Sequence, residues 1–481
     1  MRTLTLLRIL VILLGVGALI MLIPLALALI LGEQRMIWAL GLPAGIIIAA
    51  ALPAFFSYRK NPLRFRARDG FLLVFLTWVG MSLLGAMPFY LSAREFSFTN
   101  AFFESACGFA TTGATTITDV EALPKSLLLW RSISHWVGGM GIVLLTVALM
   151  PLLGVGGFQL IKAEVSGPEK ERITPKITAT AKVMWFTYCI LTAVLVILFR
   201  IGGMEWLDAF CHSFTTMASG GISTKNSGLS WYNSAFIDHV TMVFMLLAGL
   251  NFNLYFRLAR GKFKDIITNT EARVYLGIFL ISAAAITFTL IPVYGSLSAS
   301  WRFGAFHAAS ILSTTGAVIA DYSVWPAFAQ AILFALMFVG GCSSSTAGGI
   351  KVIRHVVLWK QTGNELRRIL FPQGVFSIQL NKKVGRKDVV YGVSAFVFLY
   401  AAVVTIVALI TAASGVDIFS SFSTALSVIS NIGVGFGAIG PGHNFGAFPD
   451  QLKWLYSFAM IAGRLELWTV LILFTPEYWR R

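Results

Sequence analysis

Four short segments of the chain share a pattern of residues that could hold a metal cation. Each has thirteen residues and ends on a glycine, with a small residue three places before that glycine and a polar residue two places before it. The segments are Ala101 to Gly113, Ala209 to Gly221, Gly304 to Gly316 and Ser421 to Gly433. Because glycine lets a backbone point successive carbonyl groups the same way, four such loops could line a common axis with oxygen atoms. The pattern predicts an ion filter.

In each copy, the glycine and the two residues before it are the candidate ligands. Small residues also permit close packing of membrane helices, and a hydroxyl can simply bond to a nearby carbonyl. That alternative does not explain a polar residue at the same place in all four copies, so we interpret these residues as ligands of a monovalent cation. They are Thr111, Thr112 and Gly113, Ser219, Gly220 and Gly221, Thr314, Thr315 and Gly316, and Asn431, Ile432 and Gly433.

The composition places the chain in a lipid bilayer. Of its 481 residues, 57% are hydrophobic and 12% are charged, and the mean hydropathy is +0.79, which is too apolar for an ordinary soluble protein. Ten apolar runs come close to the roughly 20 residues that cross a hydrocarbon core of about 30 Å. We therefore expect an all-α polytopic membrane protein with ten transmembrane helices. The runs cover residues 9–31, 36–57, 70–92, 132–155, 183–203, 235–256, 273–295, 327–357, 388–412 and 452–475.

The net charge of +16 indicates membrane topology and not binding of nucleic acid. Most of the 37 lysines and arginines fall in alternate loops, and they do not gather on one face. Loops rich in positive charge stay on the cytoplasmic side of a membrane. This rule predicts that both termini are cytoplasmic in a bacterial plasma membrane. The densest basic segments are 59–68, 162–182, 257–264, 351–387 and 480–481.

The glycine segments belong to a repeat of about a hundred residues: an apolar run, a short amphipathic run, the glycine loop and a second apolar run. The short run has about ten residues, too few to cross the membrane, so it must enter and return among surrounding protein or water. The loops should therefore meet at one axis, where the C-terminal ends of four short helices favour a cation. The predicted divisions are an N-terminal hairpin with a basic loop at 1–69, then pore repeats at 70–181, 182–268, 269–386 and 387–481.

The eighth apolar run contains small and polar residues that favour an interruption of its helix. Glycine and serine have poor helix propensity, so the helix should unwind partway across the membrane. A kink that merely packs against a neighbour is the alternative. The residues are Gly340, Gly341, Cys342, Ser343, Ser344, Ser345, Thr346, Ala347, Gly348 and Gly349, and Lys351 and Arg354 follow.

One charged residue is expected near the middle of the last apolar run. Arg464 lies about twelve residues into this run, or roughly 18 Å at 1.5 Å per residue. A charge at that depth is costly, so it should face a wet cavity or bond to carbonyl groups. We expect it to be an electrostatic barrier in the pore or an anchor for the unwound stretch. The alternative is a structural pair with Glu466 or a helix carbonyl.

The remaining polar residues give weaker signals. Five carboxylates near the outer loops could concentrate cations, although ordinary solvated charges are the alternative: Glu104, Asp119, Asp208, Asp321 and Asp417. Four cysteines lack metal-ligand spacing and are expected to be packing residues: Cys107, Cys189, Cys211 and Cys342. The six histidines show no paired spacing, so we expect no enzymatic site.

Longer motifs connect these residues to a known family. They are ATTGAT (110–115), ASGGIST (218–224), STTGA (313–317), NIGVG (431–435), WVGGMGI (136–142), GGCSSSTAGGIKVIR (340–354) and GRLE (463–466). On the basis of these motifs, essentially the whole chain resembles the Trk/Ktr/HKT superfamily of potassium transporters. The added N-terminal hairpin makes it most similar to the bacterial TrkH/TrkG branch.

The resemblance implies a membrane subunit that conducts potassium inward through a pseudo-fourfold pore within one chain. It implies a gate formed by residues 340–349 with Lys351 and Arg464, a homodimer, and a cytoplasmic nucleotide-binding regulatory subunit of the TrkA type. Potassium would be the substrate held at the filter, and no covalently bound cofactor is expected. Gly113 favours potassium, because some sodium-preferring relatives have serine there. Three residues depart from the pattern of many relatives and leave a sodium-permeable or poorly selective cation transporter as the alternative: Thr315, Ala317 and Val434.

Overall fold

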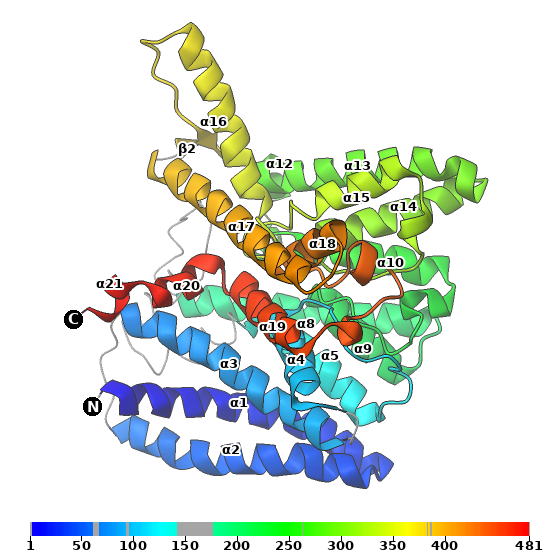
Figure 1. Cartoon of the computed structure of the whole chain (residues 1–481), viewed down its shortest axis with the longest axis vertical. Coiled ribbons are helices and arrows are strands. Elements are labelled where there is room, and N and C mark those ends of the chain that lie inside the picture. The colour runs from blue at the N-terminus through cyan, green and yellow to red at the C-terminus, as the bar shows by residue number, and fades with distance from the viewer. Residues whose placement is uncertain are drawn as a thin grey trace.

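The computed structural model describes residues 2–60, 67–92, 96–141, 177–261, 263–381, 383–384 and 387–480. Within these residues the chain is mostly helical, as predicted from its composition (Figure 1). The only sheet in this part of the chain is a two-residue antiparallel pair, β1 (Gln379–Leu380) with β2 (Lys383–Val384).

Six described helices are long and apolar enough to cross a bilayer. The shortest of them have 25 residues, or about 37 Å at 1.5 Å per residue, which exceeds a hydrocarbon core of about 30 Å. Counting each of two bent helix pairs as one span raises the number to eight among the described residues. The chain is therefore a multi-pass membrane protein. The six helices are α1 (Arg2–Leu31), α2 (Gln34–Lys60), α3 (Ala67–Ser92), α8 (Ile177–Ile201), α13 (Thr270–Tyr294) and α17 (Lys387–Ala413).

Two expected spans are bent, which their continuous hydropathy did not indicate. The expected spans at 235–256 and 452–475 are bent helix pairs, whose axes turn by 95° in the first and 113° in the second. The bent pairs are α10 (Ala235–Gly249) with α11 (Phe252–Ala259) and α19 (Asp450–Arg464) with α20 (Leu467–Leu471).

A local backbone feature lies at each bend. At the first, the side chain of Asn251 accepts a hydrogen bond from the amide of Asn253 at 2.9 Å and starts a new helix. At the second, Glu466 has a φ of 60°, which an α-helix does not accommodate.

The fourth and eighth expected spans are only partly helical in the described residues. The fourth begins in α5 (Lys125–Gly139), and its part beyond residue 141 lies outside the described residues. The eighth divides into α15 (Ala327–Leu336) and the start of α16 (Val352–Leu370). Between them, residues 337–351 form turns and extended chain.

Four short, largely buried helices lie among the long ones. They have 12 to 16 residues where about ten were expected, and even 16 residues cover only about 24 Å, which is too short to cross. Three of them begin at Ser97, Ser296 or Asp417, each of which accepts a hydrogen bond from an amide of the first turn. The short helices are α4 (Phe98–Ala110), α9 (Trp206–Met217), α14 (Leu297–Leu312) and α18 (Ile418–Ser430).

Each short helix packs against the long helix that precedes it and against a helix from elsewhere in the chain. α4 packs against α3 and α19, α9 against α8 and α5, and α14 against α13 and α10. α18 packs against α17, and its Phe419 and Phe422 meet Phe334 of α15. Figure 1 shows how this brings α19 beside α4, although the two are far apart in the sequence.

The N-terminal hairpin of α1 and α2 lies at one edge of the molecule, against α3 and α5 (Figure 1). Small residues allow the close approach: a methyl group built on Gly15 would lie 2.6 Å from Cβ of Ala51. At the opposite edge, α16 projects from the helical body. The remaining helices are α12 (Phe263–Thr268), α21 (Pro476–Trp479) and the 3₁₀ turns η2 (Gly228–Tyr232), η3 (Tyr322–Val324), η4 (Gly437–Ile439), η5 (Phe445–Ala447) and η6 (Ile472–Phe474).

Candidate ion filter and gate

Each short helix ends in the same tight reversal of the chain. The residue two places before the filter glycine has a left-handed backbone in every copy, and the amide of the next residue donates to a carbonyl five residues earlier, as from Thr112 to Cys107. This is the Schellman arrangement that ends many helices. The left-handed residues are Thr111 (φ 54°), Ser219 (57°), Thr314 (54°) and Asn431 (57°).

The four loops contact one another in a closed ring. A methyl group built on any filter glycine would collide with a backbone carbonyl oxygen of the next loop, and the fourth loop returns to the first. Each of these oxygens belongs to a residue just before a filter glycine and lies at a junction between two loops. The pairs are Gly113 with Gly220 O (2.3 Å), Gly221 with Thr315 O (2.0 Å), Gly316 with Ile432 O (1.9 Å) and Gly433 with Thr112 O (2.0 Å).

The second copy has a second glycine, Gly220, where the other loops have Thr112, Thr315 and Ile432. The reason is the imidazole of His135 on α5, which is buried behind this loop. A methyl group built on Gly220 would lie 2.1 Å from Nδ1 of His135. The position therefore admits no side chain.

The polar side chains at the left-handed positions join the loops to other segments. Ser219 Oγ lies 2.8 Å from Thr346 Oγ1, and Thr314 Oγ1 accepts a hydrogen bond from the amide of Gly348 at 2.6 Å. Two of the four loops are thus tied to the stretch at 340–351.

The other two left-handed positions behave differently. Asn431 Nδ2 donates to Thr112 Oγ1 and to the carbonyl of Met460, both at 2.9 Å, so it joins the fourth loop to the first and to α19. Thr111 Oγ1 is buried and has no hydrogen-bond partner among the described residues.

The stretch at 340–351 fits between the filter loops and the bend of α10. The amide of Cys342 donates to the carbonyl of Gly249 at 2.8 Å, and the amide of Ser343 donates to Glu271 Oε1 at 2.6 Å. A methyl group built on Gly348 would lie 2.1 Å from the carbonyl oxygen of Ser430, directly before the fourth loop. The stretch is therefore in contact with the ring of loops.

Arg464 is the last residue of α19 and donates to backbone carbonyls of two other segments. Its Nη1 lies 2.5 Å from the oxygen of Thr346, and its Nη2 lies 3.0 Å from the oxygens of both Gly138 and Gly139. The chain bends just after it, partway along the last apolar run. The first of these bonds joins it to the 340–351 stretch.

Two further basic residues lie at the end of the stretch and just after it. Lys351 Nζ donates to the carbonyl of Ala347 at 2.5 Å. Arg354 forms an ion pair with Glu466 at 2.5 Å, and its guanidinium carbon lies 3.7 Å from the ring centroid of Phe396. The carboxylate of Glu466 therefore binds Arg354.

Sequence reasoning missed one residue in each copy, six places before the filter glycine. Its side chain donates to the carbonyl of the residue just after that glycine, so we call these four residues the strap residues. Cys107 is buried, as a packing residue would be, and its thiol also donates a hydrogen bond. A small side chain with a hydrogen-bond donor at this place in all four copies was the available signal. The bonds run from Cys107 to Ala114 (2.8 Å), from Thr215 to Ile222 (3.0 Å), from Ser310 to Ala317 (2.7 Å) and from Ser427 to Val434 (3.0 Å).

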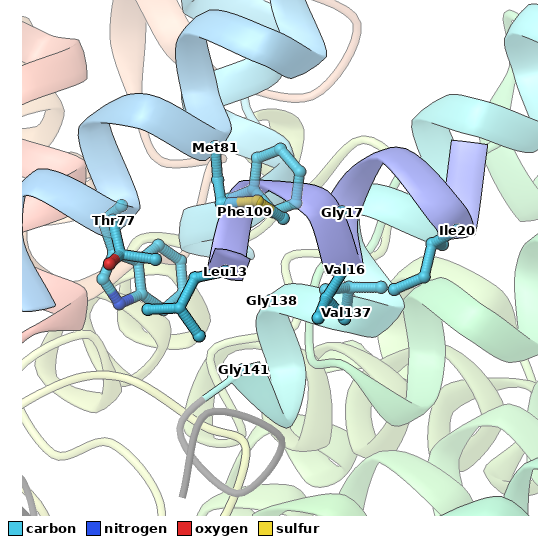
Figure 2. Close-up of a pocket in the computed structure, with 11 residues that line it drawn as sticks. Leu13, Val16, Gly17, Ile20, Thr77, Met81, Phe109, Val137, Gly138 and Gly141 are labelled. Carbon is cyan, nitrogen blue, oxygen red and sulfur yellow. The ribbon is translucent and has the colours of Figure 1, made fainter. Parts of the chain in front are cut away.

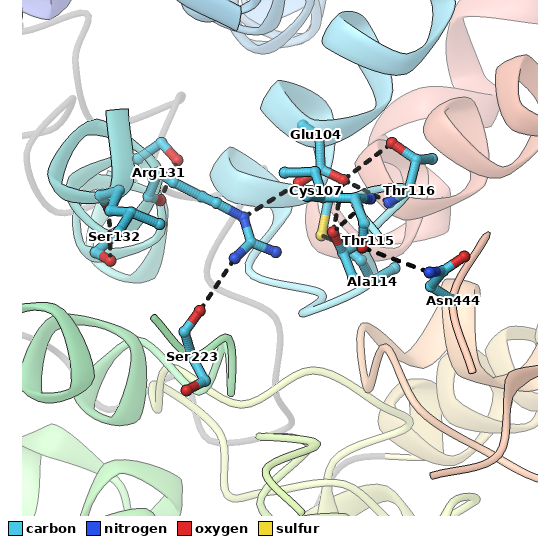
Figure 3. A network of polar contacts seen from close by, with 12 residues as sticks. Glu104, Cys107, Ala114, Thr115, Thr116, Arg131, Ser132, Ser223 and Asn444 are labelled. Carbon is cyan, nitrogen blue, oxygen red and sulfur yellow. Dashed lines mark hydrogen bonds and ion pairs between the residues drawn. The ribbon is translucent and has the colours of Figure 1, made fainter. Parts of the chain in front are cut away.

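Glu104 is a structural residue of the first loop (Figure 3). It is 2% exposed, and its Oε1 accepts hydrogen bonds from the amide of Thr116 at 2.5 Å and the hydroxyl of Thr115 at 2.8 Å. Its Oε2 pairs with Nε of Arg131 at 3.2 Å, and Nη1 of Arg131 reaches the carbonyl of Ser223 in the second loop. A role of Glu104 as a solvated charge at the outer mouth is therefore excluded.

The other outer carboxylates also have local partners. Asp208 accepts hydrogen bonds from Thr224 and Tyr232, and Asp321 and Asp417 accept amide bonds at the start of helices. Asp119 is exposed, and a hydrogen bond from Asn226 lowers the pKa of its carboxyl group. Asp119, Asp321 and Asp417 are all exposed, so these three fit ordinary solvated charges.

Replacing Arg131 with methionine should destabilise the folded protein by about 3–5 kcal/mol, because Glu104 would remain buried without a compensating charge. Both side chains are almost fully enclosed, with exposed fractions of 3% and 1%. The unfolding temperature of the detergent-purified protein, followed by tryptophan fluorescence, measures the effect.

A second substitution, Glu104→Gln, in the Arg131→Met protein should recover part of the lost stability. The control is Arg368→Met on α16, whose partner Glu365 is 46% exposed, so the loss should stay below about 1 kcal/mol. Equal unfolding temperatures for Arg131→Met and Arg368→Met would contradict the buried ion pair.

A pocket between α1, α3, α4 and α5 is lined by apolar groups that include Met81, Phe109 and Gly138 (Figure 2). It offers almost no oxygen atoms to a cation. Among the described residues, no cluster of three or more histidine, cysteine, aspartate or glutamate side chains could hold a metal ion. The closed ring of loops is therefore the strongest candidate for the functional site.

Comparisons with known proteins agree with this site. Residues 41–481 match the family TrkH, described as cation transport protein. The chain is 37% identical to the Trk system potassium uptake protein TrkH of Halomonas elongata, with 99% of each chain covered. It is 37% identical to the protein of that name from Escherichia coli strain K12, with 88% of each covered.

A solved structure gives the same result for the fold. The crystal structure of the potassium transporter TrkH from Vibrio parahaemolyticus is similar with a TM-score of 0.89, 33% identity and full coverage of both chains. The resemblance inferred from the motifs is thereby confirmed. The chain belongs to the TrkH family of cation transport proteins, and it is a transporter and not an enzyme.

Proposed function

We propose that the protein takes up potassium across the bacterial plasma membrane through a gated pore whose filter is the ring of four loops. The closed ring carries this proposal, because it gathers four loop backbones at one place within a multi-pass membrane protein. The names of the relatives, which are potassium uptake proteins, support potassium as the substrate.

Conduction follows from the backbone of the loops. Carbonyl oxygens of the residues before and at the filter glycines would replace the water around a potassium ion. The C-terminal ends of α4, α9, α14 and α18 lie at the ring and add partial negative charge, which favours a cation and repels an anion. We assign the ligands to Thr111 to Gly113, Ser219 to Gly221, Thr314 to Gly316 and Asn431 to Gly433.

The stretch at 340–351 would be the gate, with Arg464 as its anchor. It bonds directly to Ser219 and Thr314, so a movement of the stretch would reach the filter. The stretch ends at Lys351 and leads directly into α16, and a cytoplasmic TrkA-type nucleotide-binding subunit could pull on this connection.

The proposed architecture has ten spans, four pore repeats and an added N-terminal hairpin, with the divisions given by the sequence. Both termini would be cytoplasmic, and α1 begins on the side of the molecule where α21 lies (Figure 1). We further propose that two copies form a homodimer, as the resemblance implies.

Expression in a bacterium without its own potassium uptake systems should restore growth at low potassium when the regulatory subunit is supplied. Cells of the same strain that do not express the protein are the control. The amount of the protein in the membrane is measured in parallel. Absent growth with normal amounts of both proteins would reject potassium uptake.

A sodium-permeable or poorly selective pathway is the second candidate. Uptake of potassium and sodium by the purified protein in vesicles separates the two candidates, and Gly113→Ser should shift the preference toward sodium if the first loop contributes to selectivity. Equal uptake of the two ions by the unchanged protein would favour the second candidate.

A further inference from the structure

The four strap residues attach the chain that follows each filter glycine to its own short helix. After the reversal at the left-handed residue, the chain returns along the helix, so the residue after the glycine lies beside the residue seven places earlier. All four bonds span seven residues, and Cys107, Thr215, Ser310 and Ser427 are each at most 1% exposed. The same bond thus recurs in all four loops.

A second attachment lies further along the returning chain in three of the loops. The amide three places after the glycine donates to the side chain of the short helix, as from Thr116 to Glu104 at 2.5 Å and from Phe436 to Ser423 at 2.8 Å. In the third loop, the amide of Ile319 donates to Nε2 of His307 at 3.4 Å. In these loops, two bonds hold the peptide groups that follow the filter glycine.

We propose that the strap residues are positioning residues that set the selectivity of the pore between monovalent cations, and that Cys107 forms the weakest of the four straps. The proposal rests on the proposed function of the ring as a filter. A carbonyl that is held toward the short helix fixes its peptide plane and limits rotation of the neighbouring filter carbonyls. Loops that cannot contract around a smaller ion discriminate better against it.

The four straps differ in strength because their donors differ. A thiol is a weak hydrogen-bond donor, whereas the hydroxyls of Thr215, Ser310 and Ser427 are ordinary donors. Figure 3 shows the thiol of Cys107 aimed at the carbonyl of Ala114 within the network that includes Glu104. The first loop therefore depends more on Glu104 and less on its strap than the other loops.

The test compares potassium and sodium uptake by the full-length protein in proteoliposomes, which needs no regulatory subunit if both fluxes are measured under the same conditions. Thr215→Val keeps the shape of the side chain and removes the donor. It should lower the ratio of potassium uptake to sodium uptake about fivefold, because the free energy of one ordinary hydrogen bond corresponds to about this factor. Potassium uptake itself should continue. Thr241→Val on α10 is the matched control, because the hydroxyl of this buried residue bonds only within its own helix.

The first loop gives a second, graded comparison. Cys107→Ser replaces a weak donor by a stronger one and should keep or raise the ratio, whereas Cys107→Ala should lower it. The proposal is overturned if Thr215→Val leaves the ratio unchanged, or if serine and alanine at position 107 lower it equally. Absent potassium uptake by the unchanged protein even with the regulatory subunit supplied would instead reject the proposed function.

Discussion

Gly316→Ala should reduce potassium uptake by about 100-fold. This is the size of loss expected when groups that must be precisely placed are displaced by about 1 Å. The added methyl group would lie 1.9 Å from the carbonyl oxygen of Ile432, a distance at which one loop must move. Because each loop contacts the next, a shift of the third loop also displaces the fourth. Uptake of a potassium tracer into proteoliposomes measures the result.

A matched glycine separates this collision from backbone strain. Gly295, at the end of α13, has a φ of 69°, close to the 72° of Gly316, but no atom lies within 4 Å of a methyl group built on it. Gly295→Ala introduces the same strain of roughly 1–2 kcal/mol without the collision, so uptake should stay near that of the unchanged protein. Equal losses in the two variants would show that strain alone causes the defect and would contradict a closed ring.

The register of the filter loops could be predicted from sequence because each loop carries its own local signal. A polar residue followed two places later by a glycine lies at the end of a single short helix, and this pair recurs in four copies. The strap residues were equally accessible, since they lie six places before each glycine. They were missed because Cys107 was considered with the other cysteines and not with Thr215, Ser310 and Ser427.

The bends and the buried ion pair could not be predicted because they depend on contacts between distant segments. The apolar runs at 235–256 and 452–475 are continuous in hydropathy, and the bends appear only where the chain meets other parts of the protein. The amide of Phe252 in α11, for example, donates to the carbonyl of Ser344. Glu104 likewise looks like an outer loop charge until the fold brings Arg131 of α5 against it.

Arg464 could be recognised as unusual from sequence, but its role depends on partners that sequence does not place together. The charge stands out in an apolar run, and a buried guanidinium must find acceptors. Its acceptors come from the end of α5 and from the 340–351 stretch, which are about 200 residues apart. Because one side chain joins these two segments beside the filter loops, its removal tests the proposed gate directly.

Arg464→Met should raise potassium flux without the regulatory subunit by about tenfold. The variant loses hydrogen bonds from a charged group to Thr346, Gly138 and Gly139, and bonds of this kind contribute about 1.5–3 kcal/mol each. Even about 1.4 kcal/mol in favour of an open stretch changes the open population tenfold. Loss of the positive charge also lowers the repulsion that a cation meets there.

Tracer flux into proteoliposomes without the regulatory subunit measures this effect. Arg464→Lys serves as an intermediate variant and Arg200→Met as a control. Lysine keeps the charge but has a compact ammonium group that cannot span three carbonyls, so its flux should lie between those of the unchanged protein and Arg464→Met. Arg200 bonds to the carbonyl of Met204 at the end of α8, away from the stretch, and its replacement should leave the flux unchanged. A folded Arg464→Met protein whose flux is unchanged or lower would rule out Arg464 as the anchor of a closed gate, because release of the 340–351 stretch can only favour its open state.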